Sequence, residues 1–196
     1  MARTQAKNFD KRRDAIRQSA AELYARKGFR ATSLGEIAAA CGTSKSLLYH
    51  YFQSKEDILY DVMMTHVQEL ADLAMRMETI NETADRKIHI LARDLMRAYQ
   101  GAEAAQKILL NEMHNLPAMR QSLVVMHQRE VLDVVDGLLI ALRPALRTQP
   151  TRRRPIVMMF FGMLNWTHIW FDPNGPATGE EIADLAAGMF LRGLPQ

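Results

Sequence analysis

The sequence predicts an all-α fold of about nine helices. Apolar residues recur at the three- and four-residue spacing of a helical face along most of the chain, and no stretch alternates apolar and polar residues as a strand would. Capping motifs and glycines also divide the N-terminal part into short helical segments. We therefore expect helices packed on helices, without a sheet.

Composition places the chain among ordinary globular proteins. Of its 196 residues, 48% are hydrophobic and 24% are charged, which excludes a disordered, collagen-like or disulfide-stapled chain. The single cysteine, Cys41, cannot form an internal disulfide, and the charged N-terminus is unlike a signal segment, so we expect a cytoplasmic protein. The apolar segment 156–171 is shorter than the ~20 residues that cross a bilayer, and we expect a buried helix and no membrane partner.

Positive charge is concentrated at the N-terminus. The whole chain has a formal net charge of +3, but residues 1–55 contain eleven Lys/Arg and four Asp/Glu, a net charge of +7, and the remainder has a net charge of −4. Two interpretations fit this distribution: the segment binds a polyanion such as nucleic acid, or it is a solvated basic surface.

The first expected helix spans about residues 10–27. Ile16, Ala20 and Tyr24 recur on one face of it, and the arginines between them fall on the others. Gly28 then ends the helix, because glycine adopts the left-handed conformation of a C-cap at little cost.

Two short helices follow, each with a start signal. Ser33 and Glu36 form a capping box that opens a helix over residues 34–41, and Ser44 can cap a second helix over residues 45–51. Gly42 lies in the short turn between them. A short helix, a turn containing glycine and a second short helix form the helix-turn-helix arrangement.

The remainder of the chain reads as longer helices. A cap at Ser54 opens a helix that extends to about Met77, and Thr178 can cap the last one. The other helices are expected near 85–99, 102–114, 117–146, 152–171 and 179–193. Pro144 predicts that the helix beginning at 117 stops near Arg143.

The N-terminal motifs resemble the DNA-binding signature of the tetracycline-repressor (TetR) family. The resemblance covers residues 10–60 and departs from the usual pattern at Gly35 and Thr43. The segments that carry it are Thr32-Ser33-Leu34-Gly35-Glu36-Ile37-Ala38, Cys41-Gly42-Thr43-Ser44-Lys45-Ser46-Leu47-Leu48-Tyr49-His50-Tyr51-Phe52 and Ser54-Lys55-Glu56. The resemblance implies a helix-turn-helix DNA-binding domain over residues 1–55 and a ligand-binding and dimerisation domain over residues 56–196. It further implies a homodimeric transcriptional regulator, a repressor released from a palindromic operator in double-stranded DNA when an effector binds. An activator or a ligand-independent architectural protein is the alternative within the same class.

Candidate DNA contacts lie on and around the second short helix. Its outward side presents small polar and basic side chains that suit a major groove, although Ser44 could serve mainly as a cap. By resemblance, Tyr49 and Lys55 would anchor phosphates, and Thr32 and Ser33 would reach a phosphate through a hydroxyl and a backbone N–H. The expected contacts are Thr32, Ser33, Ser44, Lys45, Ser46, Tyr49, His50 and Lys55.

The C-terminal part is rich in methionine and has polar residues within apolar stretches. Methionine suits an adaptable cavity, although each one could equally fill a core. By resemblance, the effector would be a small hydrophobic molecule or an acyl-coenzyme A thioester. The expected ligand-binding residues are Met96, Tyr99, Met113, His114, Met126, His127, Phe161, Asn165 and Trp166.

The aromatic segment 165–171 has two possible roles. The resemblance implies that the last two helices pair with a second subunit, and we expect Trp170, Phe171 and Met189 in that dimer interface. Trp166 could lie either there or in the ligand cavity. The run Arg152-Arg153-Arg154 is either a solvated helix end or a grip on coenzyme A phosphates.

Signals for catalysis and metal binding are missing from the sequence. It has no nucleophile elbow, glycine-rich phosphate loop or metal-ligand spacing, so we expect neither an enzyme nor a cofactor or metal site. The alternative interpretation is a helical carrier or small enzyme for an apolar ligand. That alternative leaves the caps, the glycine turn and the polar second helix without an explanation.

Overall fold

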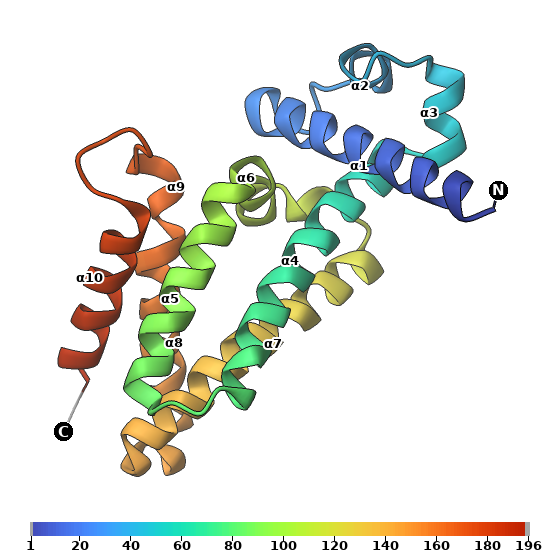
Figure 1. Ribbon diagram of the computed structural model, residues 1–196. Coiled ribbons are helices and arrows are strands. Elements are labelled where there is room, and N and C mark those ends of the chain that lie inside the picture. Colours follow the sequence, from blue (N-terminus) through green and yellow to red (C-terminus); the bar gives the residue numbers. More distant parts are fainter. Residues whose placement is uncertain (1, 195–196) are drawn as a thin grey trace. The chain divides into compact units, whose positions relative to one another are not determined.

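A computed structural model describes residues 2–194, and every regular element in that range is helical (Figure 1). The helices are α1 (Ala2–Lys27), α2 (Leu34–Ala40), α3 (Lys45–Tyr51), α4 (Lys55–Thr79), α5 (Ala84–Gly101), α6 (Glu103–Asn111), α7 (Ala118–Leu142), α8 (Pro150–Asn165), α9 (Thr167–Trp170) and α10 (Gly179–Arg192), with 3₁₀ turns η1 (Met113–Asn115) and η2 (Pro144–Thr148). The all-α prediction is confirmed, and α9 is a single turn directly after α8.

The chain folds as two compact units. Unit 1 contains the described residues up to His66 together with residues 104–124, and unit 2 contains residues 67–103 and those from 125 onward. The division differs from the expected boundary at 55/56, because the first turns of α4, all of α6 beyond its first residue and the start of α7 pack with the N-terminal helices.

The predicted caps shape the N-terminal helices of unit 1. The Ser33 hydroxyl accepts a hydrogen bond from the Glu36 N–H, and the Glu36 carboxylate accepts one in return from the Ser33 N–H at 2.9 Å. The Ser44 hydroxyl caps α3 by accepting from the Leu47 N–H at 3.1 Å. Gly28 and Gly42 both have positive φ, at 84° and 59°, so a side chain at either turn would be strained.

The core of unit 1 joins α1 to the three helices that follow. The predicted inner face of α1 is buried, with Ile16 and Ala20 fully covered and Tyr24 1% exposed. Leu48 of α3 and Ile58 of α4 are also fully buried. Since α2 and α3 are only two turns long, this shared core is what holds them in place.

Unit 2 is organised around α5, α8 and α10, which lie side by side in Figure 1. The Phe160 and Phe190 rings pack with centroids 5.1 Å apart between α8 and α10. At the edge of the α5 and α10 contact, Arg93 donates two hydrogen bonds to Asp184, at 2.7 and 2.6 Å. These bonds from Arg93 lower the pKa of the Asp184 carboxyl.

Several helix boundaries differ from those expected from the sequence. The expected helix 152–171 begins at Pro150 and breaks at Trp166, where the Thr167 hydroxyl donates to the Leu164 carbonyl at 2.6 Å and the ring of His168 lies 2.6 Å from the Asn165 carbonyl. The helix expected over 102–114 ends at Asn111, and α7 ends at Leu142 ahead of Pro144, as the proline predicted. In contrast, α1 begins at Ala2 rather than near residue 10.

The described part of the chain lacks two features, a membrane-spanning helix and a cluster of metal ligands. None of its helices is both long enough and apolar enough to cross a bilayer. Nor do three or more histidine, cysteine or acidic side chains gather there as a metal site would require.

Candidate DNA-binding surface and effector cavity

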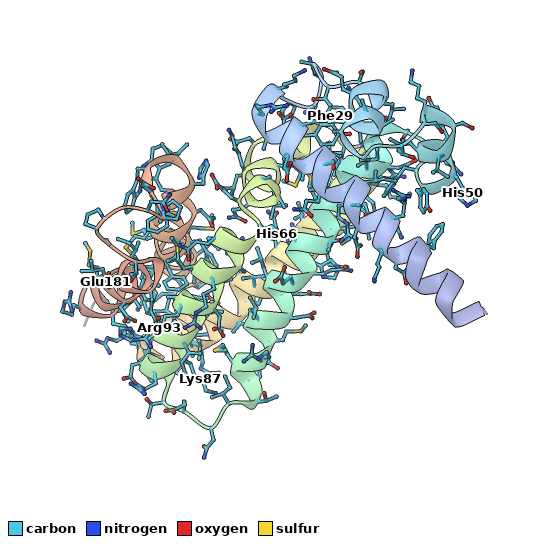
Figure 2. The ribbon with its side chains drawn as sticks, turned by 45° about the horizontal axis from the view of Figure 1, so that its top comes forward. Phe29, His50, His66, Lys87, Arg93 and Glu181 are labelled. Atoms are coloured by element: carbon cyan, nitrogen blue, oxygen red, sulfur yellow. The ribbon has the colours of Figure 1, made fainter. Side chains whose placement is uncertain are left out.

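Helix α3 presents the predicted polar residues to solvent. Its inner side is fixed by Leu48, which is fully buried, and Tyr49 on the other side exposes half of its surface. Figure 2 shows His50 projecting outward at the end of the helix. Five residues that were expected to contact DNA are exposed, namely Ser44, Lys45, Ser46, Tyr49 and His50, and Leu47 between them is exposed as well. Ser44 also caps the helix, so the two roles considered for it coexist.

The two residues before α2 differ in exposure. Ser33 is exposed and its side chain belongs to the capping box. Thr32 is only 1% exposed, and its hydroxyl donates to the Gly28 carbonyl at 2.9 Å and lies 3.5 Å from the Leu23 carbonyl. The hydroxyl of Thr32, which was expected to reach a phosphate, therefore holds the turn after α1 from inside the fold.

Lys55 also has a structural role instead of the expected phosphate contact. Its ammonium donates to the carbonyls of Phe29 and Thr32, at 2.7 and 2.8 Å, and to that of Arg30 at 3.3 Å. It also lies 4.3 Å from the centroid of the Phe29 ring. With its three donors directed at three carbonyls, Lys55 clamps the loop between α1 and α2 onto the start of α4.

Several of the N-terminal cations are neutralised within unit 1. Arg13 and Arg17 of α1 both bind Asp61 of α4, through atoms 2.5 and 3.0 Å apart. Lys27 pairs with Glu36, and hydrogen bonds from Lys27 and Ser33 lower the pKa of Glu36 to about 2. Among the described residues, no such ion pair is recorded for Lys45, so its charge remains available on α3.

The segment 104–124 is fastened to the loop between α1 and α2. The Glu112 carboxylate accepts a hydrogen bond from the Phe29 N–H at 3.4 Å and one from the Asn115 amide at 2.6 Å. The side chain of Arg30 donates to the side-chain amide oxygen of Asn115 at 3.3 Å. These contacts, which the sequence patterns did not reveal, place the end of α6 directly against the helix-turn-helix.

Two further polar contacts within unit 1 involve α4. Arg120 of α7 binds Asp57 near the start of α4. Deeper in the unit, His66 of α4 and Gln106 of α6 are 3% and 2% exposed, and their side chains meet at 2.8 Å. A buried polar pair of this kind favours one relative position of the two helices, because separating them would leave polar groups without partners.

The residues expected to bind a ligand are not gathered in one place. Met113 and His114 belong to unit 1 and the other seven to unit 2. Met96 and Phe161 are core residues, 1% and 6% exposed, whereas Met126 exposes 46% of its surface. The remaining four are Tyr99, which is buried, His127 and Asn165, which are partly exposed, and Trp166, which is exposed.

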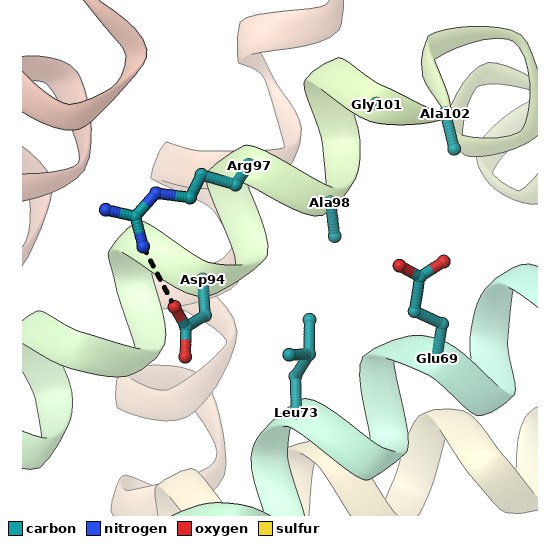
Figure 3. A pocket seen from close by; sticks show the side chains of 7 residues that line it. All are labelled: Glu69, Leu73, Asp94, Arg97, Ala98, Gly101 and Ala102. Atoms are coloured by element: carbon teal, nitrogen blue, oxygen red, sulfur yellow. Dashed lines mark hydrogen bonds and ion pairs between the residues drawn. The ribbon is translucent and has the colours of Figure 1, made fainter.

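Unit 2 has a cavity of about 310 Å³ between α4 and α5 (Figure 3). In Figure 3, the Glu69 carboxylate points toward α5, and Asp94 is paired with Arg97 at one end. The lining residues are Glu69, Leu73, Asp94, Arg97, Ala98, Gly101 and Ala102. None of the nine expected ligand residues lines this cavity. The prediction selected methionines and polar residues within apolar stretches, whereas the cavity is bordered by small residues and by charges at its rim.

Large apolar side chains are exposed on the last three helices of unit 2. Trp166 exposes 62% of its surface and Trp170 53%, so neither is buried within its own chain. Phe171 is partly exposed. The other exposed apolar residues on these helices are Met158, Met159, Ile169, Leu185 and Met189. We call the set Met158, Met159, Trp166, Ile169, Trp170, Leu185 and Met189 the C-terminal apolar surface.

The three consecutive arginines of α8 are not equivalent. Arg153 binds Asp136 at 2.6 Å and also donates to the carbonyls of Leu146 and Arg147. Arg152 and Arg154 are exposed, and no ion pair is recorded for either among the described residues. Arg153 is therefore a structural residue, and only its two neighbours present free guanidinium groups.

Comparison with known sequence families gives two matches that together cover most of the chain. Residues 16–62 match the family described as "Bacterial regulatory proteins, tetR family". Residues 81–194 match the family described as "Tetracyclin repressor-like, C-terminal domain".

Individual relatives agree with these matches. The chain is 27% identical to the HTH-type transcriptional repressor KstR2 of Mycolicibacterium smegmatis, over 94% of this chain and 91% of the relative. A TetR-family regulator from Bordetella parapertussis has a similar structure, with a TM-score of 0.88 and 32% identity over 92% of this chain and 94% of that one. The structure of AibR in complex with isovaleryl coenzyme A and operator DNA gives a TM-score of 0.79 and 27% identity, over 91% of this chain and 97% of that one.

Proposed function

The chain belongs to the TetR family and is a DNA-binding transcriptional regulator, and from this premise we propose that it is a homodimeric repressor which leaves a palindromic operator when a small effector binds. Membership in this family of regulators also removes the carrier or enzyme interpretation. The observation that carries the proposal is the exposed polar side of α3. Leu48 anchors this helix in the core, Ser44 caps its start, and Lys55 holds the loop before α2.

We assign operator reading to α3. Lys45 and His50 present donors on an exposed, short helix of the size that enters a major groove, and Tyr49 presents a hydroxyl for a phosphate. The proposed contacts are Ser33, Ser44, Lys45, Ser46, Tyr49 and His50. Thr32 and Lys55 are left out because their polar groups are engaged inside the fold.

The C-terminal apolar surface supports the dimer. Monomeric soluble proteins rarely expose contiguous apolar patches larger than a few hundred Å², and tryptophan is enriched at the centre of interfaces. We therefore place both tryptophans, Trp166 and Trp170, together with Phe171 and Met189 in the interface with a second copy of the chain. Two-fold symmetry then sets two α3 helices about one turn of DNA apart, ~34 Å or a multiple of it.

We propose an effector with a small apolar part that occupies the cavity between α4 and α5. A volume of about 310 Å³ suits a short acyl group better than a whole coenzyme A, which would extend out of the cavity. An acyl-coenzyme A is the first effector to test, because AibR, a relative in sequence and structure, was crystallised with isovaleryl coenzyme A. Arg152 and Arg154 are the candidate phosphate contacts, since Arg153 is held by Asp136.

Segment 104–124 provides a physical route from the effector to α3. Its contacts through Glu112 and Asn115 hold the loop before α2, and Arg120 holds the start of α4. An effector that favours another position of α6 would therefore disturb the support of the DNA-binding helices. It can lower operator affinity only by the ratio of its own affinities for the two conformations.

A DNA titration tests the regulator assignment. The parent protein selects its operator from random duplexes, and binding to that operator is then compared with binding to a scrambled duplex. We expect Tyr49→Phe to weaken both complexes to a similar degree, because it removes a phosphate donor, and His50→Ala to reduce the preference for the operator. Binding that shows no sequence preference in the parent would contradict the assignment.

Calorimetry with isovaleryl coenzyme A tests the effector assignment. Leu73→Trp fills the cavity and should abolish binding, and the double variant R152A/R154A should weaken it if these arginines hold the phosphates. Met75→Trp, which adds the same ring at an exposed residue of α4 outside the cavity lining, is the matched control. Full affinity in the Leu73 variant would exclude this cavity as the effector site.

A further inference from the structure

Helix α1 extends well ahead of the segment that matches the family. It begins at Ala2, whereas the match begins at residue 16. The first twelve residues contain Arg3, Lys7, Lys11 and Arg12 against a single acid, Asp10, so this end of the chain is basic.

Phe9 fixes this part of α1 against α3. Its ring centroid lies 4.6 Å from that of Tyr51 and 6.0 Å from that of His50, both in the last turn of α3. Phe9 is seven residues before the buried Ile16, so it continues the inner face of α1 beyond the core of the helix-turn-helix. Residues next to Phe9 are therefore positioned together with the end of α3.

The charges beside Phe9 are free, in contrast to those one turn later. Arg13 and Arg17 are bound to Asp61. Lys11 and Arg12 are exposed, and among the described residues neither has a recorded carboxylate partner. Arg12 lies three residues after Phe9, on the flank of the face that meets α3.

We propose that Lys11 and Arg12, on the part of α1 that Phe9 holds against α3, form a second DNA-contacting surface, which binds the phosphate backbone beside the groove that receives α3. The surface supplies affinity without reading sequence, because phosphate contacts position a protein and base contacts specify it. It rests on the proposed function, since it presupposes that α3 binds DNA, and it adds contacts outside the family motif.

Salt dependence of DNA binding tests the charges of this surface. Each phosphate that a protein neutralises contributes about 0.9 to the slope of log affinity against log salt concentration. The double variant K11Q/R12Q should therefore have a slope shallower by up to about 1.8 per protomer, on both operator and scrambled duplexes. The matched control is R129Q/R147Q, which removes the same charge from exposed arginines in unit 2 and should keep the parent slope.

Phe9→Ala separates docking from net charge. The variant keeps every cation but removes the ring that fixes α1 against α3, so its slope should also become shallower. Thermal unfolding of each variant reports whether the fold is retained, and the partial exposure of Phe9 predicts that it is.

The outcomes separate this surface from the proposed function. A parent protein without operator preference would remove the regulator assignment and this surface with it. Normal operator binding with an unchanged slope in K11Q/R12Q would overturn the surface alone. Equal loss of slope in the unit 2 control would also overturn it, because it would reduce the effect to long-range net charge.

Discussion

Lys55→Met removes the clamp on the loop between α1 and α2 while keeping an apolar side chain of similar length. Hydrogen bonds to a charged group contribute about 1.5–3 kcal/mol, and an exposed cation–π contact adds about 0.5–1 kcal/mol. Two of the three carbonyls that Lys55 binds lie at 2.7 and 2.8 Å, and water can replace part of what is lost because Lys55 is partly exposed. We expect the free energy of unfolding to fall by about 2 kcal/mol, equivalent to about 4–8 °C in Tm for a chain of this size.

Urea unfolding at a fixed protein concentration measures the loss, since the stability of a dimer depends on concentration. Lys45→Met is the matched control: the same chemical change on the exposed surface of α3 should alter stability by less than about 0.5 kcal/mol but weaken operator binding. If Lys55→Met instead had the stability of the parent and bound all duplexes weakly, its ammonium would contact a phosphate and the clamp would be refuted.

Three further predictions follow from single contacts. Thr32→Val removes the buried hydroxyl that donates to the Gly28 carbonyl, so the free energy of unfolding in urea should fall by about 1 kcal/mol while operator affinity stays unchanged. A lower operator affinity would instead indicate that Thr32 contacts DNA. Hydrogen bonds from Lys27 and Ser33 lower the pKa of Glu36 to about 2, so ionised Glu36 stabilises the fold above its ordinary pKa of 4.5, and this stabilisation is lost as the pH falls from 4.5 to 2. Glu36→Gln should therefore lose less stability than the parent over this pH range. Identical stability profiles of the two proteins in acid would refute the role of Glu36. Trp170→Glu should shift the protein toward monomer in analytical ultracentrifugation, because it places a charge in the proposed interface. Met119→Glu, the same kind of change at a residue of α7 that is 80% exposed, should leave the dimer intact. If both variants remained dimeric, the interface would not include Trp170.

The N-terminal helices were predictable because their signals are local. A capping box needs a serine and a glutamate three residues apart, and a positive φ at a turn needs a glycine, so both can be recognised without knowledge of the fold. The structure has these features at Ser33, Glu36, Gly28 and Gly42. The beginning of α1 was missed, since residues 2–9 lack the apolar periodicity that marks a buried face.

The cavity was not predictable, because it depends on which faces of α4 and α5 fail to meet. Its walls include Ala98 and Gly101, which are small residues with no chemical signature in the sequence. Met96 and Tyr99, which the composition suggested as ligand contacts, lie on the same helix but are buried. A methionine on a helix face fills a core or lines a cavity according to its neighbours from other helices, which periodicity within one helix does not report.

The number of lysines and arginines in residues 1–55 overstates the positive charge that this segment can present to DNA. Of its eleven Lys/Arg, Arg13 and Arg17 share Asp61, Arg17 also pairs with Asp14, Lys27 pairs with Glu36, and the Lys55 ammonium is held by carbonyls. Free cations remain on α3 and at Lys11 and Arg12 of α1, beside Phe9. The salt dependence of operator binding should therefore be smaller than eleven contacts per protomer would give. A slope near that full count would mean that the internal ion pairs open on DNA.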